Sequence, residues 1–223
     1  MDFFRLENAI CDINKLHKEI SRIYLIDNSF NLKSICVKDV VENSSKISKE
    51  FLDYIDEYYA GLNTALISSN FEYDYSEWDA RIRIKQKESV INKLHHYLCN
   101  HNNGEIPIQK CLNDLLGFRL IIDDFNFNSL EIQNFLEDIK YEQNLMKWYT
   151  RNKEGYKGTH IYFKNVNNFY FPWELQIWNT AYARSNEISH EIHKAKRNYI
   201  VWPEQYKTAS LKEEEEWRII LLL

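Results

Sequence analysis

The first seventy residues place apolar side chains at every third or fourth position in two stretches. One stretch contains Phe3, Leu6, Ile10, Ile13, Leu16, Ile20 and Ile23, and the other contains Phe51, Ile55, Tyr58, Leu62 and Leu66. This spacing predicts two amphipathic helices. Residues 28–45 are polar and mixed, which predicts a loop with one short element. We therefore expect residues 1–70 to form an N-terminal helical segment.

From about residue 78 the pattern changes to short β-like runs that alternate with helices. The predicted strands are 80–84, 115–122, 144–150, 159–163 and 173–178, and the predicted helices are 88–99, 129–139 and 180–199. This order predicts an α+β (α/β-like) fold, in which helices flank a mixed sheet of about five strands. Residues 71–223 would form the α+β part of a single compact domain. Its tail, 212–223, is predicted to be a final helix.

Composition narrows the possible partners. The chain has 28 basic and 33 acidic residues and a net charge of −5, so nucleic acid could bind only at a local basic patch. It has five glycines, and their positions exclude a Walker loop and a GxGxxG turn. The four cysteines form no CxxC pair, and neither a signal peptide nor an apolar stretch of membrane-spanning length is recognisable. We expect a cytoplasmic protein with reduced thiols and no membrane contact.

Four side chains around a predicted strand-to-helix junction are spaced to bind a polyphosphate. Arg83 and Lys85 share one face of the strand. Ser89 and Lys93 lie one turn apart on the helix that follows. The cations and the hydroxyl could therefore converge on an anion at the helix N-terminus. The alternative is an ordinary solvated, lysine-rich helix start.

Two residues near the next predicted strand could bind ligands, one a metal ion and the other a purine base. Asp114 precedes the strand, where a carboxylate could bind Mg²⁺ together with phosphate oxygens. The planar guanidinium of Arg119 could stack on a purine. The alternative for Asp114 is a carboxylate that caps a turn.

Two later segments suggest the rest of a site. Gly155-Tyr-Lys-Gly-Thr-His160 precedes a predicted strand, and Tyr156 could stack on a base. A hairpin turn with an exposed tyrosine explains this segment equally well. Glu174 and Gln176 share one face of the last predicted strand, where Glu174 could act as a metal ligand or general base.

In this order, the motifs resemble the synthetase domain of the RelA/SpoT alarmone synthetases. The resemblance covers about residues 78–200 and consists of R-x-K-x3-S-x3-K, D-x-x-G-x-R, G-Y-x-x-x-H and E-L-Q-I. It implies a nucleotidyltransferase-like fold. It also implies an enzyme that transfers the β,γ-pyrophosphate of ATP to a ribose 3′-hydroxyl with Mg²⁺.

The resemblance also implies a role for each motif residue. Arg83 and Arg119 would sandwich the adenine, and the ATP phosphates would be bound by Lys85, Ser89 and Lys93. Asp114 and Glu174 would be the catalytic, metal-binding carboxylates, with Glu174 helping to deprotonate the attacking hydroxyl. The acceptor side would contain Tyr156, which stacks on the acceptor base, with His160, Gln176 and Lys153.

Departures from the family pattern fall on the acceptor side. Trp178 stands where guanosine-alarmone enzymes usually have arginine, and Glu154 and Gly158 replace an asparagine and a serine. The resulting pattern, G-Y-K-G-x-H together with E-L-Q-I-W, is similar to that of the toxic small alarmone synthetases. Several of these enzymes modify the 3′ CCA end of tRNA. We therefore expect a translation-blocking toxin that acts on tRNA. A basic surface would support it, and the candidates are Arg151, Lys153, Lys157, Arg184, Lys194, Lys196 and Arg197.

Two other interpretations stay open. One is a small alarmone synthetase that uses GDP or GTP, or makes an adenosine analogue. The other is a catalytically idle, partner-binding protein, against which the retained charged residues argue. Because no hydrolase domain is recognisable in the chain, the resemblance also implies an antitoxin partner.

Overall fold

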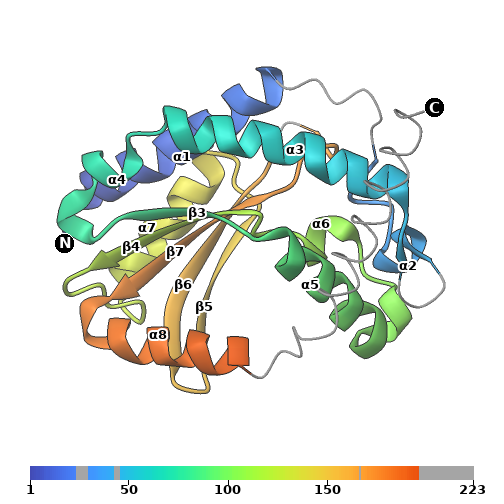
Figure 1. Ribbon diagram of the computed structural model, residues 1–223. Coiled ribbons are helices and arrows are strands. Elements are labelled where there is room, and N and C mark those ends of the chain that lie inside the picture. Colours follow the sequence, from blue (N-terminus) through green and yellow to red (C-terminus); the bar gives the residue numbers. More distant parts are fainter. Residues whose placement is uncertain (24–29, 43–45, 166, 196–223) are drawn as a thin grey trace, which may run out of the picture.

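The computed structural model describes residues 1–23, 30–42, 46–165 and 167–195, with backbone alone for 193–195 (Figure 1). The predicted tail helix and residues 196–199 of the predicted helix 180–199 lie outside this part. Among the described residues, no helix is both long and apolar enough to cross a bilayer.

A single five-stranded mixed sheet organises the molecule. Its strands are β3 (Arg81–Ile84), β4 (Leu116–Ile122), β5 (Lys147–Lys153), β6 (Tyr156–Phe163) and β7 (Trp173–Asn179). They lie in the order β3-β4-β7-β6-β5. Strands β4 and β7 are parallel, and the other neighbours are antiparallel. The predicted α+β fold with about five strands is confirmed.

Helices cover both faces of this sheet. On one face lie α1 (Phe3–Ile23), α3 (Lys49–Ser68) and α7 (Leu130–Glu142), while α8 (Thr180–Ala195) lies on the other (Figure 1). Helix α5 (Lys87–Asn100) lies beside α6 (Ile108–Cys111) at one end of the sheet. The remaining short elements are α2 (Val37–Val40), β1 (Val41–Glu42), β2 (Lys46–Ile47), α4 (Phe71–Asp74) and two 3₁₀ turns, Ser76–Trp78 and Asn102–Gly104.

Strand alternation separates a core face from a polar face. Phe118, Leu175 and Ile161 occupy matching positions on adjacent strands and are buried. The N-terminal helices share this core, since Tyr58 of α3 accepts a hydrogen bond from the indole of Trp173 at 2.9 Å. The alternate positions on the same strands carry polar and charged side chains, as expected for period-two alternation.

Strand β5 begins three residues later than predicted, because residues 144 and 145 belong to the C-terminal cap of α7. Asn144 adopts a left-handed conformation (φ 51°), and its N–H donates to the carbonyl of Tyr141. The N–H of Leu145 reaches back to Lys140. This pair of bonds is a Schellman motif, which ends the helix, so the strand begins only after it.

Strand β6 begins three residues earlier than predicted. Lys153 pairs with Tyr156, so the hairpin turn consists of Glu154 and Gly155 alone, at φ 56° and 78°. Two positive φ values are typical of a type I′ turn, whose twist matches that of the flanking strands. Tyr156 is therefore the first residue of β6 and does not belong to a loop before it.

Candidate active site

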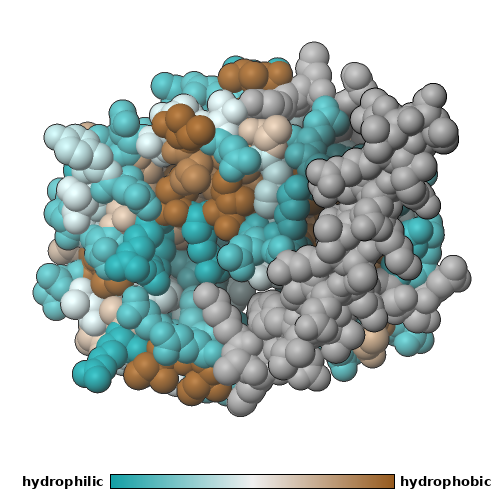
Figure 2. All heavy atoms as spheres, in the orientation of Figure 1, coloured by the Kyte–Doolittle hydropathy of each residue, from teal (hydrophilic) through white to brown (hydrophobic). Residues whose placement is uncertain are grey.

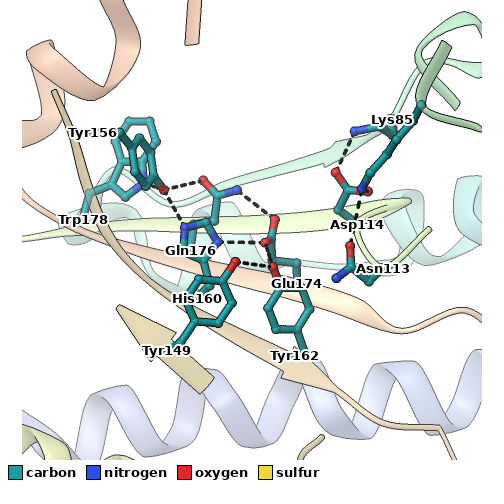
Figure 3. A network of polar contacts seen from close by, with 11 residues as sticks. Lys85, Asn113, Asp114, Tyr149, Tyr156, His160, Tyr162, Glu174, Gln176 and Trp178 are labelled. Atoms are coloured by element: carbon teal, nitrogen blue, oxygen red, sulfur yellow. Dashed lines mark hydrogen bonds and ion pairs between the residues drawn. The ribbon is translucent and has the colours of Figure 1, made fainter. Parts of the chain in front are cut away.

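The polar face of the sheet brings the predicted site residues together in two rows. One row, in register, is Arg83, Gly117, Glu174, Tyr162 and Lys147, and the next is Arg81, Arg119, Gln176, His160 and Tyr149. Hydrophilic residues surround a hollow between β3 and α8 (Figure 2). In the close view, Asp114 and its partners lie at one end, Tyr156 and Trp178 at the other, and Glu174 between them (Figure 3).

Two lysines converge on one carboxylate at the α5 end of the site. Lys85 Nζ lies 2.6 Å from Asp114 Oδ2, and Lys93 Nζ lies 3.0 Å from Asp114 Oδ1. Their side chains are only 9% and 18% exposed, and that of Asp114 is 17% exposed. Both predicted phosphate-binding lysines therefore point to the same spot, and Asp114 balances their charge.

The charge pattern fixes the protonation state of this cluster. Burial opposes ionisation of Asp114, but the nearby charges of Lys93 and Lys85 outweigh it and hold the pKa of Asp114 well below its usual range. Burial lowers the pKa of Lys85, although Asp114 partly offsets this effect. For Lys93 the same burial is outweighed by Asp114, so its pKa is raised. The cluster carries one negative and two positive charges near neutral pH.

The other two members of the polyphosphate motif flank this cluster. Arg83 is exposed on β3. Ser89 lies in the first turn of α5, where free N–H groups would favour an anion. Between Arg83 and Glu174 stands Gly117, and a Cβ built there has no heavy atom within 4 Å. The glycine therefore leaves open space on the floor of the site.

Glu174 is held by three neighbouring side chains. Its Oε1 accepts hydrogen bonds from His160 Nδ1 at 2.8 Å and from the Tyr162 hydroxyl at 2.6 Å, and Gln176 Nε2 donates to Oε2 at 2.8 Å. Burial opposes its ionisation, yet the hydrogen bond and charge of His160 outweigh burial and lower the pKa of Glu174. An ionised carboxylate with one oxygen less occupied than the other is thus kept on the floor of the site.

The two carboxylates differ in how well they suit a divalent cation. Asp114 is ionised, partly accessible and already at the centre of the charge cluster, so it suits Mg²⁺ when phosphate oxygens complete the ligand set. Glu174 is only 5% exposed. Its Oε1 already accepts two hydrogen bonds, which leaves Oε2 as the oxygen with a free lone pair.

Tyr156 is enclosed, contrary to the exposed-tyrosine alternative. It is 3% exposed, and its ring lies parallel to that of His190 from α8, with 5.4 Å between centroids. Its hydroxyl accepts a hydrogen bond from Trp178 Nε1 at 2.9 Å and lies 3.0 Å from His160 Nε2. A base could stack on this face of Tyr156 after His190 moves.

Arg119 lies against Trp178 and beside a carboxylate of α8. Its guanidinium carbon is 4.4 Å from the centroid of the Trp178 ring, and its Nη2 is 3.8 Å from Glu187. Burial lowers the pKa of Arg119, and the charge of Arg81 adds to this effect. One face of the guanidinium is therefore covered by an aromatic ring.

Sequence reasoning named Arg151 and Lys153 of β5 but missed Lys147 and Tyr149, which precede them on the same strand. Lys147, Tyr149, Arg151 and Lys153 alternate along the polar face of this edge strand and are all exposed. The Tyr149 ring lies parallel to that of His160, 5.2 Å away. Had the two-residue turn at 154–155 been recognised, the alternation would have placed Tyr149 and Tyr162 on the site face.

The predicted basic surface is described only in part. Lys157 lies 4.4 Å from the ring centroid of Tyr182, and Arg184 is exposed on α8. The side chain of Lys194 and all of Lys196 and Arg197 lie outside the described residues.

Comparison with known proteins finds solved structures with low sequence identity to this chain. No protein-family model and no curated protein matches the chain. Among solved structures, a GTP pyrophosphokinase family protein from Streptococcus pneumoniae shows a TM-score of 0.44 and 15% identity, covering 78% of this chain and 94% of that one. The small alarmone synthetase 1 from Bacillus subtilis, bound to its product pppGpp, shows a TM-score of 0.43 and 16% identity, covering 79% and 99%. The small alarmone synthetase 2 from Bacillus subtilis shows 0.39 and 18%, covering 78% and 100%.

Proposed function

We propose that the chain is an ATP-dependent pyrophosphokinase that transfers the β,γ-pyrophosphate of ATP to a ribose 3′-hydroxyl. The observation that supports it best is the convergence of Lys85 and Lys93 on Asp114, beside Glu174 on the same face of the sheet. Phosphoryl-type transfer depends mainly on positioning and on neutralising charge. Two buried cations and an ionised carboxylate supply both at one point.

The donor nucleotide would lie across β3 and β4. Arg83 and Arg119 are diagonal neighbours on these antiparallel strands, and such pairs are about 7–8 Å apart. A planar ring in contact at about 3.5 Å on each side needs about 7 Å. The spacing of the two strand positions therefore suits one adenine between Arg83 and Arg119. The triphosphate would extend over Gly117 towards Lys85, Lys93 and Ser89.

The reaction would occur between Asp114 and Glu174. The acceptor 3′-oxygen forms a bond to the β-phosphorus of ATP, the bond from that phosphorus to the α,β-bridging oxygen breaks, and AMP leaves. The hydroxyl proton passes to Oε2 of Glu174, which has a lone pair free. A Mg²⁺ ion held by Asp114 would neutralise charge on the phosphates.

For the acceptor, we infer the 3′ end of tRNA. Exposed Lys147, Arg151 and Lys153 follow one another along β5, with Tyr149 between the first two. A row of cations with an aromatic ring suits an extended phosphate backbone that carries unpaired bases. Modification of the 3′ end would block aminoacylation, so the protein would act as a toxin, and we infer an antitoxin that neutralises it.

A labelled-phosphate assay tests both the proposed reaction and the proposed acceptor. ATP labelled in its γ-phosphate is incubated with deacylated tRNA, GDP, GTP or AMP, with and without Mg²⁺. Label on tRNA is expected. Label on GDP, GTP or AMP alone would replace the tRNA proposal by the alarmone alternative, and no transfer to any acceptor would refute the enzyme proposal.

Matched carboxylate variants test whether transfer depends on Asp114 in particular or on any carboxylate that pairs with a lysine. Asp114→Asn should abolish transfer and toxicity on expression. Asp56→Asn removes a carboxylate that also pairs with a lysine, Lys87, but at an exposed position, and it should retain both. If Asp114→Asn remained fully toxic, the idle, partner-binding interpretation would be favoured.

A further inference from the structure

Trp178 packs against the side chain of Arg119. It is fully buried, and its indole Nε1 donates a hydrogen bond to the hydroxyl of Tyr156 at 2.9 Å. The rings of Tyr156 and His190 meet it edge-on, with centroids 5.9 Å and 5.4 Å away. The indole plane is thus fixed on several sides, and the guanidinium of Arg119 lies 4.4 Å from its centroid.

Gly158 makes this arrangement possible. A Cβ at position 158 would lie 2.9 Å from Trp178 Cδ1 and 2.8 Å from the hydroxyl oxygen of Tyr156. Real carbon atoms do not approach so closely, so any larger residue at 158 would displace the indole or the tyrosine. Gly158 and Trp178, which both depart from the pattern of the family that the sequence resembles, therefore form one packing unit.

Arg119 depends on this unit for its orientation. Its ion pair with Glu187 is long, at 3.8 Å, and Glu187 is half exposed, so this contact fixes the guanidinium weakly. Its Nε is buried without a hydrogen-bond partner among the described residues. The Trp178 ring offers an extended flat surface, and the guanidinium carbon lies over it, 4.4 Å from the ring centroid.

We propose that Trp178 is a positioning residue for the donor base: it fixes the plane of Arg119, so that the opposite guanidinium face stacks on adenine. This inference rests on the proposed function, because it takes ATP as the donor. The order along the site is then Arg83, adenine, Arg119 and Trp178. A cation–π contact of a desolvated guanidinium is strong enough to change affinity about tenfold to thirtyfold.

A binding experiment tests the stack without requiring catalysis. ATP and inorganic tripolyphosphate are titrated by calorimetry into the wild type, Trp178→Met and Trp178→Phe. Methionine fills much of the volume but has no ring, so ATP affinity should fall about tenfold to thirtyfold. Tripolyphosphate has no base, so its affinity should change less than twofold. Phenylalanine should restore most of the ATP affinity.

Two further variants keep the experiment decisive. Trp148→Met removes an indole that packs against the core on the other face of the sheet, and it should leave the ratio of ATP to tripolyphosphate affinity unchanged. If Trp178→Met does not fold, Gly158→Ala, whose methyl group would displace the indole or the Tyr156 ring that holds it, should lower the same ratio.

The outcomes for the inference and for the proposed function are distinguishable. Equal losses for ATP and tripolyphosphate, or an unchanged ratio in Trp178→Met, would overturn the role of Trp178. A wild type that binds ATP with the expected Trp178 dependence but transfers no pyrophosphate would support the stack and refute the proposed reaction. A wild type that does not bind ATP would overturn both.

Discussion

Replacing Asp114 by asparagine should destabilise the protein, because two mostly buried lysines would lose their shared counter-charge. Lys85 and Lys93 approach Asp114 at 2.6 Å and 3.0 Å, and none of the three side chains is more than 18% exposed. Breaking a buried pair by removing one partner costs about 3–5 kcal/mol. Asparagine keeps one acceptor oxygen, so we expect the low end, about 3 kcal/mol.

This loss should be visible in thermal unfolding at pH 7. A domain of this size loses about 2–4 °C in Tm per kcal/mol, so the Asp114→Asn variant should melt about 6–12 °C lower. Asp56→Asn is the matched control, since Asp56 pairs with Lys87 at 2.5 Å but both side chains are at least half exposed. Such pairs contribute about 0–1 kcal/mol, and the control should melt within about 4 °C of the wild type.

The pH dependence of this difference has a defined sign. The pKa of Asp114 is lowered by folding, so its contribution to stability is complete above its unfolded pKa of about 4. The contribution is lost as the pH falls through the lower folded value. The gap in Tm between wild type and variant should therefore be constant above about pH 5 and close in more acidic buffer.

Adding tripolyphosphate tests independently whether Asp114 is the counter-charge of Lys85 and Lys93. Phosphate oxygens can replace the lost carboxylate beside Lys85 and Lys93, so the ligand should raise the Tm of the variant more than that of the wild type. A Tm within about 2 °C of the wild type, or an equal fall in Asp56→Asn, would refute the charge balance inferred for this cluster.

Three other substitutions probe separate parts of the site. Glu174→Gln should slow single-turnover transfer about 10²–10⁴-fold while calorimetry shows unchanged ATP affinity, because it removes a base and no ATP contact. Gly117→Ala should leave the Tm equal or higher, since nothing lies within 4 Å of the new methyl, but should weaken ATP binding several-fold by filling the site floor. Tyr149→Ala should raise the KM for tRNA about tenfold and leave that for ATP unchanged, whereas Tyr73→Ala, at an 84% exposed tyrosine on α4, should change neither.

The positions of the polyphosphate-motif residues could be predicted because they depend on local periodicity. Arg83 lies on β3 and Lys85 follows the end of that strand, two residues later along the chain. Lys93 follows one turn after Ser89 on a helix whose start the polar run indicates. These spacings along the chain do not depend on how the strand and the helix pack in the fold. The sequence could not reveal that both lysines contact Asp114, because this contact depends on how α5 packs beside β4.

The contributions of Tyr149 and of helix α8 to the site could not be predicted, because they depend on strand register and on a distant helix. The two-residue turn at 154–155 places Tyr149 beside His160 on the site face. The side chain of Asn186 in α8 both accepts from the N–H of Lys157, at 2.8 Å, and donates to its carbonyl, at 2.7 Å. This pair of bonds fixes α8 over β6, and His190 from the same helix then covers Tyr156.

The buried tryptophan and the exposed basic strand have a common physical explanation. An arginine at position 178 would be fully enclosed and would need a counter-charge, for example the phosphates of a free nucleotide. Trp178 needs space instead, which Gly158 provides, and it brings no charge of its own to this end of the site. Cations for an acceptor are found outside, at Lys147, Arg151 and Lys153 on the edge strand. An acceptor whose phosphates lie along the surface and whose 3′ end alone enters the site matches this distribution, which favours a polynucleotide over a free nucleotide.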